Sequence, residues 1–216
     1  MFKKLKKIWK KNTLDTIKKQ THDMLIMEED MFKDSMTSVF GKENKTKKVQ
    51  LMDRKINKYE KDMREKILTH LTINPREDLT SFLLMLEVAR QIERIGDYCK
   101  NICDLRDLYG KRVDNGKYLK EIIEAKDKIT ESFEILIRSY ERNNKADARK
   151  VMDIHKKIIN PKLKKIKTNI VKEPKMNAKK AVVFSLIARY LRRISAHQAN
   201  VASAIINPFL KTYDFR

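Results

Sequence analysis

The sequence has few of the residues that break or cross-link a chain. Its 216 residues include four glycines, four prolines, two cysteines and one tryptophan. Turns should therefore be few and elements long, and the abundance of leucine, isoleucine, lysine and glutamate favours an all-α fold. Cys99 and Cys103 lie four residues apart on one expected helix, so we predict reduced core thiols of a cytosolic protein. A Cys-x-x-x-Cys metal pair is a less favoured alternative.

Long apolar runs and enzyme motifs are also missing. No stretch of 18 apolar residues occurs, which argues against a transmembrane helix, and the N-terminus lacks the continuous apolar core of a signal peptide. There is no glycine-rich phosphate loop, no His-Glu-x-x-His motif and no plausible Ser/His/Asp or Cys/His arrangement. We therefore expect a protein that acts by binding and not as an enzyme.

Acidic residues are scarce relative to basic ones. Fifty lysines and arginines stand against 29 aspartates and glutamates, for a formal net charge of +21. From Ile154 to Tyr213 the only acid is Glu173, against fourteen lysines and arginines. This excess favours an anionic partner, such as a membrane surface, a nucleic acid, phosphate or an acidic protein. Nucleic acid is less favoured, because the sequence shows no helix-turn-helix spacing and no aromatic stacking platform.

The first 12 residues form a basic amphipathic segment. Residues 1–11 hold six lysines, and the apolar residues among them can share one face of a helix. Such a segment suits an anionic membrane surface. The alternative is a plain extension of the first helix that packs against its own bundle. The residues predicted to contact a membrane are Phe2, Lys3, Lys4 and Trp9.

Hydrophobic periodicity and turn signals predict six helices in two groups of three. The first group covers about 13–39, 46–71 and 74–109, and the second about 118–142, 146–172 and 178–207. Pro161 should kink or split the fifth helix. Short loops favour antiparallel neighbours. We therefore predict a basic N-terminal segment (1–12), a first three-helix bundle (13–112) and a second one (113–216).

The third helix carries the pattern around which the chain is organised. Apolar residues recur at alternating spacings of four and three, a helix-packing seam made of Val88, Ile92, Ile95, Cys99 and Ile102. Glu93, Asp97 and Asn101 follow one another at intervals of four, so they share a face beside that seam. This polar row is either a solvated acidic edge or part of a carboxylate metal site.

The two groups of helices repeat each other. Residues 88–97 line up with 187–196, and Asn101-Ile102 lines up with Asn200-Val201. Each copy ends the third helix of its group, as expected for two tandem units.

Several of these segments resemble the PhoU family. Residues 92–97, followed by Asn101-Ile102, resemble the family signature; residues 53–57 resemble the acidic motif of its second helix. Residues 74–79 resemble the entry to its third helix, with Thr80 where arginine is usual. The resemblance implies two tandem three-helix bundles and a cytoplasmic, often dimeric regulator of phosphate uptake and signalling. Such a regulator contacts a phosphate transporter and a sensor kinase at the inner membrane face. An accessory subunit of a phosphate transporter is a close variant, and a basic helical nucleic-acid-binding protein is the alternative from another class.

The resemblance also implies a metal site in the first bundle. Iron, zinc or magnesium is expected, as a divalent or trivalent ion, and oxygen ligands suit such hard or borderline cations. The implied ligands are Asp53, Asp78, Glu93 and Asp97, with Asn57 and Asn101 as supporting neighbours.

The second bundle departs from the family pattern. Arg192 stands where the glutamate belongs and Ala196 where the aspartate belongs, while His155 and Ile159 occupy the facing positions. We therefore expect no metal in the second bundle, and two histidines without nearby acids are weak evidence for zinc. A cluster of basic residues could instead attract an anion or an anionic partner, although drift after loss of the metal site is the favoured explanation. The candidate residues are Lys156, Lys157, Arg192 and Arg193.

Overall fold

The protein is helical throughout the part of the chain that the computed structural model describes. That part covers residues 2–74, 79–113 and 115–207, with side chains from Thr13 onward. It contains no strand, which confirms the predicted all-α fold. The elements are α1 (Phe2–Phe40), α2 (Thr46–Ile73), α3 (Leu79–Tyr109), α4 (Leu119–Arg142), α5 (Lys145–Asp153), the π-helical segment η1 (Ile154–Ile159), α6 (Asn160–Val171) and α7 (Ala178–Ile206).

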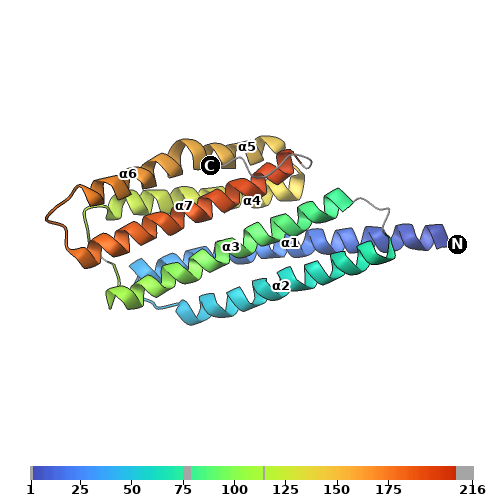
Figure 1. Ribbon diagram of the computed structural model, residues 1–216, viewed down its shortest axis with the longest axis horizontal. Helices are drawn as coiled ribbons and strands as arrows, with labels where there is room; N and C mark the ends of the chain where they lie inside the picture. The colour runs from blue at the N-terminus through green and yellow to red at the C-terminus, as the bar shows by residue number, and fades with distance from the viewer. Residues whose placement is uncertain (1, 75–78, 114, 208–216) are drawn as a thin grey trace.

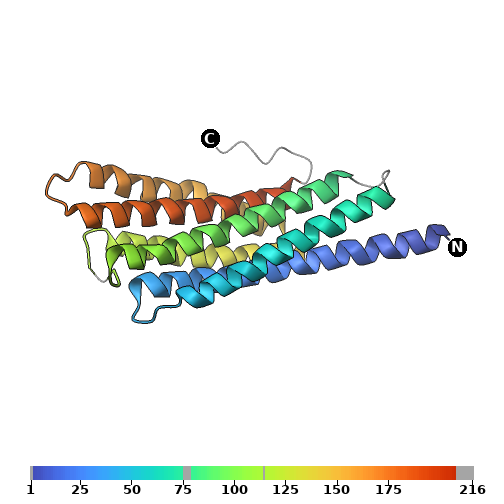
Figure 2. The ribbon, with the colours of Figure 1, turned by 60° about the horizontal axis from the view of Figure 1, so that its bottom comes forward.

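The helices form two antiparallel three-helix bundles that lie side by side (Figures 1 and 2). Helices α1, α2 and α3 make the first bundle; α4, the α5–η1–α6 run and α7 make the second. Helix α3 packs along α7, and α1 packs against α4. Buried apolar residues of both bundles therefore belong to one continuous core. The divisions predicted at 12/13 and 112/113 stay predictions.

Helix α1 begins much earlier than its periodicity indicated. It runs without a break from Phe2, and not from about Thr13, so the backbone of the basic segment continues the first helix. The side chains of Phe2, Lys3, Lys4 and Trp9 lie outside the described part, and their contact with a membrane stays a prediction. None of the helices within the described ranges combines the length and apolarity that a membrane crossing requires.

The core is built from the predicted apolar seams. All five seam residues of α3 are buried. Phe32 of α1 meets Phe133 of α4 with ring centroids 5.6 Å apart, which ties the two bundles together. Burying an apolar side chain of this size contributes roughly 1.5–3 kcal/mol. Cys99 and Cys103 are free and buried, as predicted, and burial raises the pKa of the Cys103 thiol to about 11, so it is unreactive at neutral pH.

The fifth predicted helix is interrupted where Pro161 indicated. Proline has no N–H to donate, and its ring collides with the carbonyl four residues earlier. The wider turns of η1, directly before Pro161, relieve this conflict, and the helix then continues as α6. Both His155 and Ile159 of η1 are buried.

Polar contacts fix the ends of the helices. The Arg106 guanidinium donates to the carbonyl oxygens of Ser38 and Glu43 at 2.6 and 3.1 Å, and so stabilises the end of α1 and the loop after it. Asn144 and Asn177 are the N-caps of α5 and α7, and each side chain accepts a hydrogen bond from the first turn.

Candidate cation site

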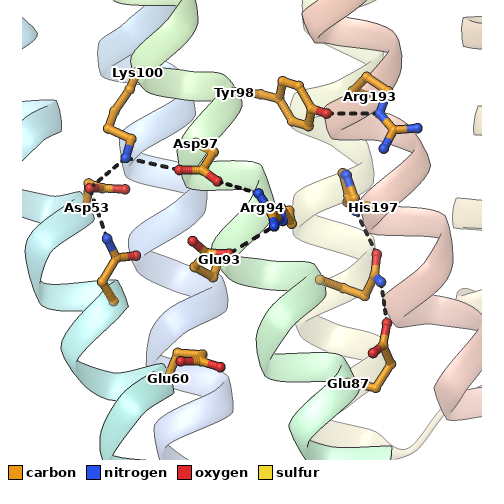
Figure 3. Close-up of polar contacts among 12 residues, drawn as sticks. Asp53, Glu60, Glu87, Glu93, Arg94, Asp97, Tyr98, Lys100, Arg193 and His197 are labelled. Carbon is orange, nitrogen blue, oxygen red and sulfur yellow. Dashed lines mark hydrogen bonds and ion pairs between the residues drawn. The ribbon is translucent and has the colours of Figure 1, made fainter.

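Three of the predicted ligands lie along the neighbouring helices α2 and α3. Glu93 and Asp97 lie one turn apart on α3, and Asp53 approaches from α2 (Figure 3). Asn57, one turn further on, donates to Asp53 Oδ2 at 3.2 Å, so this predicted supporting contact is present. Asn101 is half-buried on the same row of α3. Asp78 lies outside the described residues.

A lysine that the sequence interpretation did not include lies between two of these acids. The Lys100 ammonium is 2.9 Å from Asp53 Oδ2 and 3.0 Å from Asp97 Oδ1, bridging α2 and α3 (Figure 3). Arg94 donates to the other oxygen of Asp97 at 3.1 Å. Asp97 is therefore held between two cations. Burial and the nearby Asp97 raise the pKa of Glu93, whose carboxylate lies 3.9 Å from Arg94 Nε.

Sequence reasoning also missed an acid, which comes from α1. Glu28 is 0% exposed, and neither carboxylate oxygen has a hydrogen-bond partner among the described residues; the same holds for Asp53 Oδ1. Burial, and then the charge of Asp53, raise the pKa of Glu28 well above its ordinary value. The sequence did contain a signal, because Glu28 takes an inward position between Met24 and Met31 where an apolar residue is expected.

Gly96 makes room for the two inner acids. A Cβ at this position would lie 2.8 Å from Glu28 Oε1 and 3.5 Å from Asp53 Oδ1. Glycine inside a helix costs about 1 kcal/mol relative to alanine. Here it lets carboxylates from α1 and α2 approach the backbone of α3. A larger residue at position 96, inside the family's acidic motif, would therefore collide with these carboxylates.

The chemistry of these residues fits a cation. Carboxylate oxygens converge from three helices, and Asp53 Oδ1 and both oxygens of Glu28 have no side-chain donor among the described residues. Within the described ranges, however, no three or more histidine, cysteine or acidic side chains are arranged to hold a metal ion. Between Asp53 and Asp97, the positive charge that the structure provides is the Lys100 ammonium.

The corresponding place in the second bundle holds a neutral pair of side chains beside the Arg192 guanidinium. His155 of η1 and Ser195 of α7 share a hydrogen bond, with Nδ1 and Oγ 3.1 Å apart. Burial, and then Arg192, lower the pKa of His155 to about 4, so the ring is neutral at pH 7. Arg192 donates to Asn160 Oδ1 at 3.4 Å. The expectation that this bundle binds no metal stays a prediction.

The four basic residues predicted to bind an anion mostly have partners of their own. Arg193 donates to the Tyr98 hydroxyl of the first bundle at 3.1 Å, and its guanidinium lies over the Tyr98 ring. Lys157 pairs with Asp153 at 3.0 Å, while Lys156 is exposed. Arg193 is thus part of the contact between the bundles, and the anion-binding role of the group stays a prediction.

A buried polar contact joins α3 to α7 beside the acids. His197 Nδ1 and Gln91 Oε1 are 2.6 Å apart, and Asn200 donates to the same oxygen at 2.8 Å. The His197 ring stacks on Tyr98 with centroids 5.7 Å apart. Because Tyr98 directly follows Asp97, the acid cluster and the contact between the bundles share one turn of α3 (Figure 3).

A groove of about 850 Å³ lies between the bundles, near the start of α3 and the end of α7. Leu84, Met85 and Val88 of α3 line it together with apolar residues of α7, while Lys18 and Lys145 belong to α1 and α5. The groove is thus apolar inside and basic at its border. Sequence reasoning did not identify it, because its residues come from five different helices.

Comparisons with known proteins agree with this architecture. The family model of the PhoU domain matches twice, over residues 21–105 and 122–205. PhoU from Pseudomonas aeruginosa superposes with a TM-score of 0.80 at 15% identity, covering 92% of this chain and 97% of that one. The phosphate transport system regulatory protein PhoU from Streptococcus pneumoniae gives a TM-score of 0.77 at 10% identity, covering 93% and 96%. By sequence alone, no curated protein is similar enough to count as a match. The two domain matches cover most of the sequence, one in each bundle, and the chain belongs to the PhoU family.

Proposed function

We propose that the protein regulates phosphate uptake and phosphate-responsive signalling by binding a phosphate transporter, a sensor kinase or both at the cytoplasmic face of the membrane. The observation that carries this proposal is the PhoU domain match in both bundles. The helical architecture adds support, because it offers long side surfaces for protein contacts. An accessory subunit of the transporter is the close variant of the same function.

We also propose that the first bundle holds a metal ion of the kind found in the family. Asp53, Glu93 and Asp97 would hold it, with Asp78 implied by the family motif. The ion would supply a fixed positive charge that orders the space between α2 and α3. The unpartnered buried oxygens of Glu28 and Asp53 support this proposal.

The basic surface supports a position next to an anionic membrane. The net charge is +21, and the basic segment at the start of α1 adds six lysines near one end of the molecule. Each lysine or arginine near such a surface contributes about 1 kcal/mol of attraction. A homodimer, frequent in the family, is part of the same proposal.

The groove between the bundles is our candidate for the partner contact. Its apolar interior and lysine border suit an acidic amphipathic helix of the partner. Leu84→Glu should place a repelling charge in the groove and weaken co-purification with the partner. Val171→Glu makes the same change at a site that is 86% exposed and far from the groove, and serves as the control.

Uptake of radiolabelled phosphate tests the function. Cells lacking the protein should lose the normal response of uptake to external phosphate, and the wild-type chain should restore it. Tagged protein should also co-purify with a tagged phosphate transporter or sensor kinase from the same membranes. Unchanged uptake in the deletion, together with no association with either partner, would rule out the proposal. Salt-sensitive filter binding of DNA in the same preparations would then favour the nucleic-acid alternative.

A further inference from the structure

We propose that Lys100 is a built-in counter-ion that occupies the place of a metal ion and must leave before a divalent cation can bind. The inference rests on the metal site proposed above. It makes the first bundle a site with two alternative occupants, a side chain of the protein and an ion from solution.

The Lys100 ammonium occupies the position that a metal ion would need. Lys100 Nζ lies at hydrogen-bond distance from one oxygen of Asp53 and one of Asp97, on two different helices. A cation held by these two acids would need the same oxygens. Because like charges at this separation repel strongly in a partly buried site, the ammonium and a metal ion exclude each other.

The ammonium does not reach all the buried oxygens of the acids. Lys100 satisfies Asp53 Oδ2, but Asp53 Oδ1 and both oxygens of the fully buried Glu28 have no partner in the described structure. These oxygens lie together against Gly96. An unpaired buried polar atom costs on the order of 1–3 kcal/mol. The lysine therefore neutralises only the outer side of the cluster and leaves the inner side short of a positive charge.

The exposure of Lys100 makes the exchange physically accessible. Its side chain is 30% exposed, whereas that of Asp53 is 8% exposed. A long, flexible lysine can swing its ammonium into water without disturbing the apolar core. Opening the site thus requires one side chain to move and no helix to shift.

Binding of Mn²⁺ tests the proposal. Mn²⁺ prefers oxygen ligands, and its free concentration can be followed by electron paramagnetic resonance alongside calorimetry. Lys100→Met should bind Mn²⁺ at least tenfold more tightly than the wild type. Lys100→Arg keeps a positive charge at the position and should stay close to the wild type. Lys58→Met, a change of an exposed lysine on α2, removes the same charge elsewhere and controls for long-range attraction.

The outcomes are distinct. Equal Mn²⁺ affinity of Lys100→Met and wild type overturns the proposal, as does an equal gain in Lys58→Met. No binding by any variant overturns the metal site and the role of Lys100 together, while the regulatory function is judged separately by phosphate uptake. Lys100→Gln replaces Lys100→Met if circular dichroism shows that the latter does not fold. In the absence of metal, Lys100→Met should also melt at a lower temperature than Lys58→Met, because two acids lose their shared partner.

Discussion

Replacing Glu28 by glutamine should make the protein more stable, and increasingly so as the pH rises. Glu28 is fully buried without a partner, and its pKa lies well above the ordinary value. In the unfolded chain this carboxyl group ionises near pH 4.3, while in the fold it stays protonated to higher pH. Between these two pKa values the native state binds the extra proton, so stability is lost as pH rises, by up to about 1.4 kcal/mol for each pH unit.

Glutamine has nearly the same shape and no charge, so Glu28→Gln should remove this loss. The advantage over the wild type should be small at pH 5 and grow toward pH 7, by at most about 1.4 kcal/mol for each pH unit. Its amide can also donate to the unpartnered Asp53 Oδ1. For a chain of this length, each kcal/mol gained should raise the melting temperature by roughly 2–4 °C. Thermal unfolding followed by circular dichroism in EDTA, from pH 5 to 8, measures the difference.

Two results would refute this reasoning. The first is a glutamine variant less stable than the wild type at pH 8, which would mean that the ionised carboxylate has a favourable partner. The second is a difference that does not change with pH, which would mean that Glu28 does not titrate between the two pKa values. Glu28→Asp is the control, because it keeps an ionisable group and should keep the pH dependence.

The remaining predictions concern the core, a helix cap and the contact between the bundles. Phe32→Ala should destabilise the protein by about 3–5 kcal/mol in urea unfolding, since it leaves a cavity beside Phe133, and a loss below 1 kcal/mol would contradict this packing. Asn144→Ala should cost about 1 kcal/mol by removing the N-cap of α5, whereas Asn144→Asp should restore most of it. The pKa of His197 is lowered to about 4 by burial and by Arg193 and Arg94, so the unfolded state binds more protons between pH 6.5 and 4. His197 should therefore lower stability by ~3 kcal/mol across that window as the pH drops, beside a similar contribution from His155, whose pKa is also about 4. His197→Gln should flatten this fall, and an unchanged slope would contradict the assignment.

Local patterns predicted most of the fold because they depend on residues close in sequence. The seam of α3 requires only the 3.6-residue period, and the break before Pro161 requires only the missing N–H. The sequence left the start of the first helix open, because residues 2–12 carry so many lysines that the segment reads either as a separate unit or as an extension of that helix. Lysine is nonetheless a good helix former, so nothing stops the first helix from extending to Phe2.

The candidate site could be predicted only in part. Glu93 and Asp97 share a face of one helix, and the family motif adds Asp53 from the next. Glu28 could not be placed, because it comes from a third helix and its distance from Asp53 depends on how closely α1 approaches α3. Lys100 lies one turn from Asp97, but its bridge to Asp53 spans 47 residues of sequence. Side-chain bridges between helices depend on tertiary packing and leave no periodic signal.

The two bundles solve one physical problem in different ways. At the same place in each bundle, polar groups face inward from two helices, and a buried charge there must be paired or removed. In the second bundle a neutral His155–Ser195 pair replaces the acids, and Arg192 beside it donates to Asn160. In the first bundle the acids remain, a lysine pairs with two of them, and Glu28 stays unpaired at a cost to stability. An apolar residue at position 28 would remove that cost, as Met24 and Met31 show on the same face of α1. The unpaired acid is therefore better explained by the cation site proposed for the first bundle than by stability.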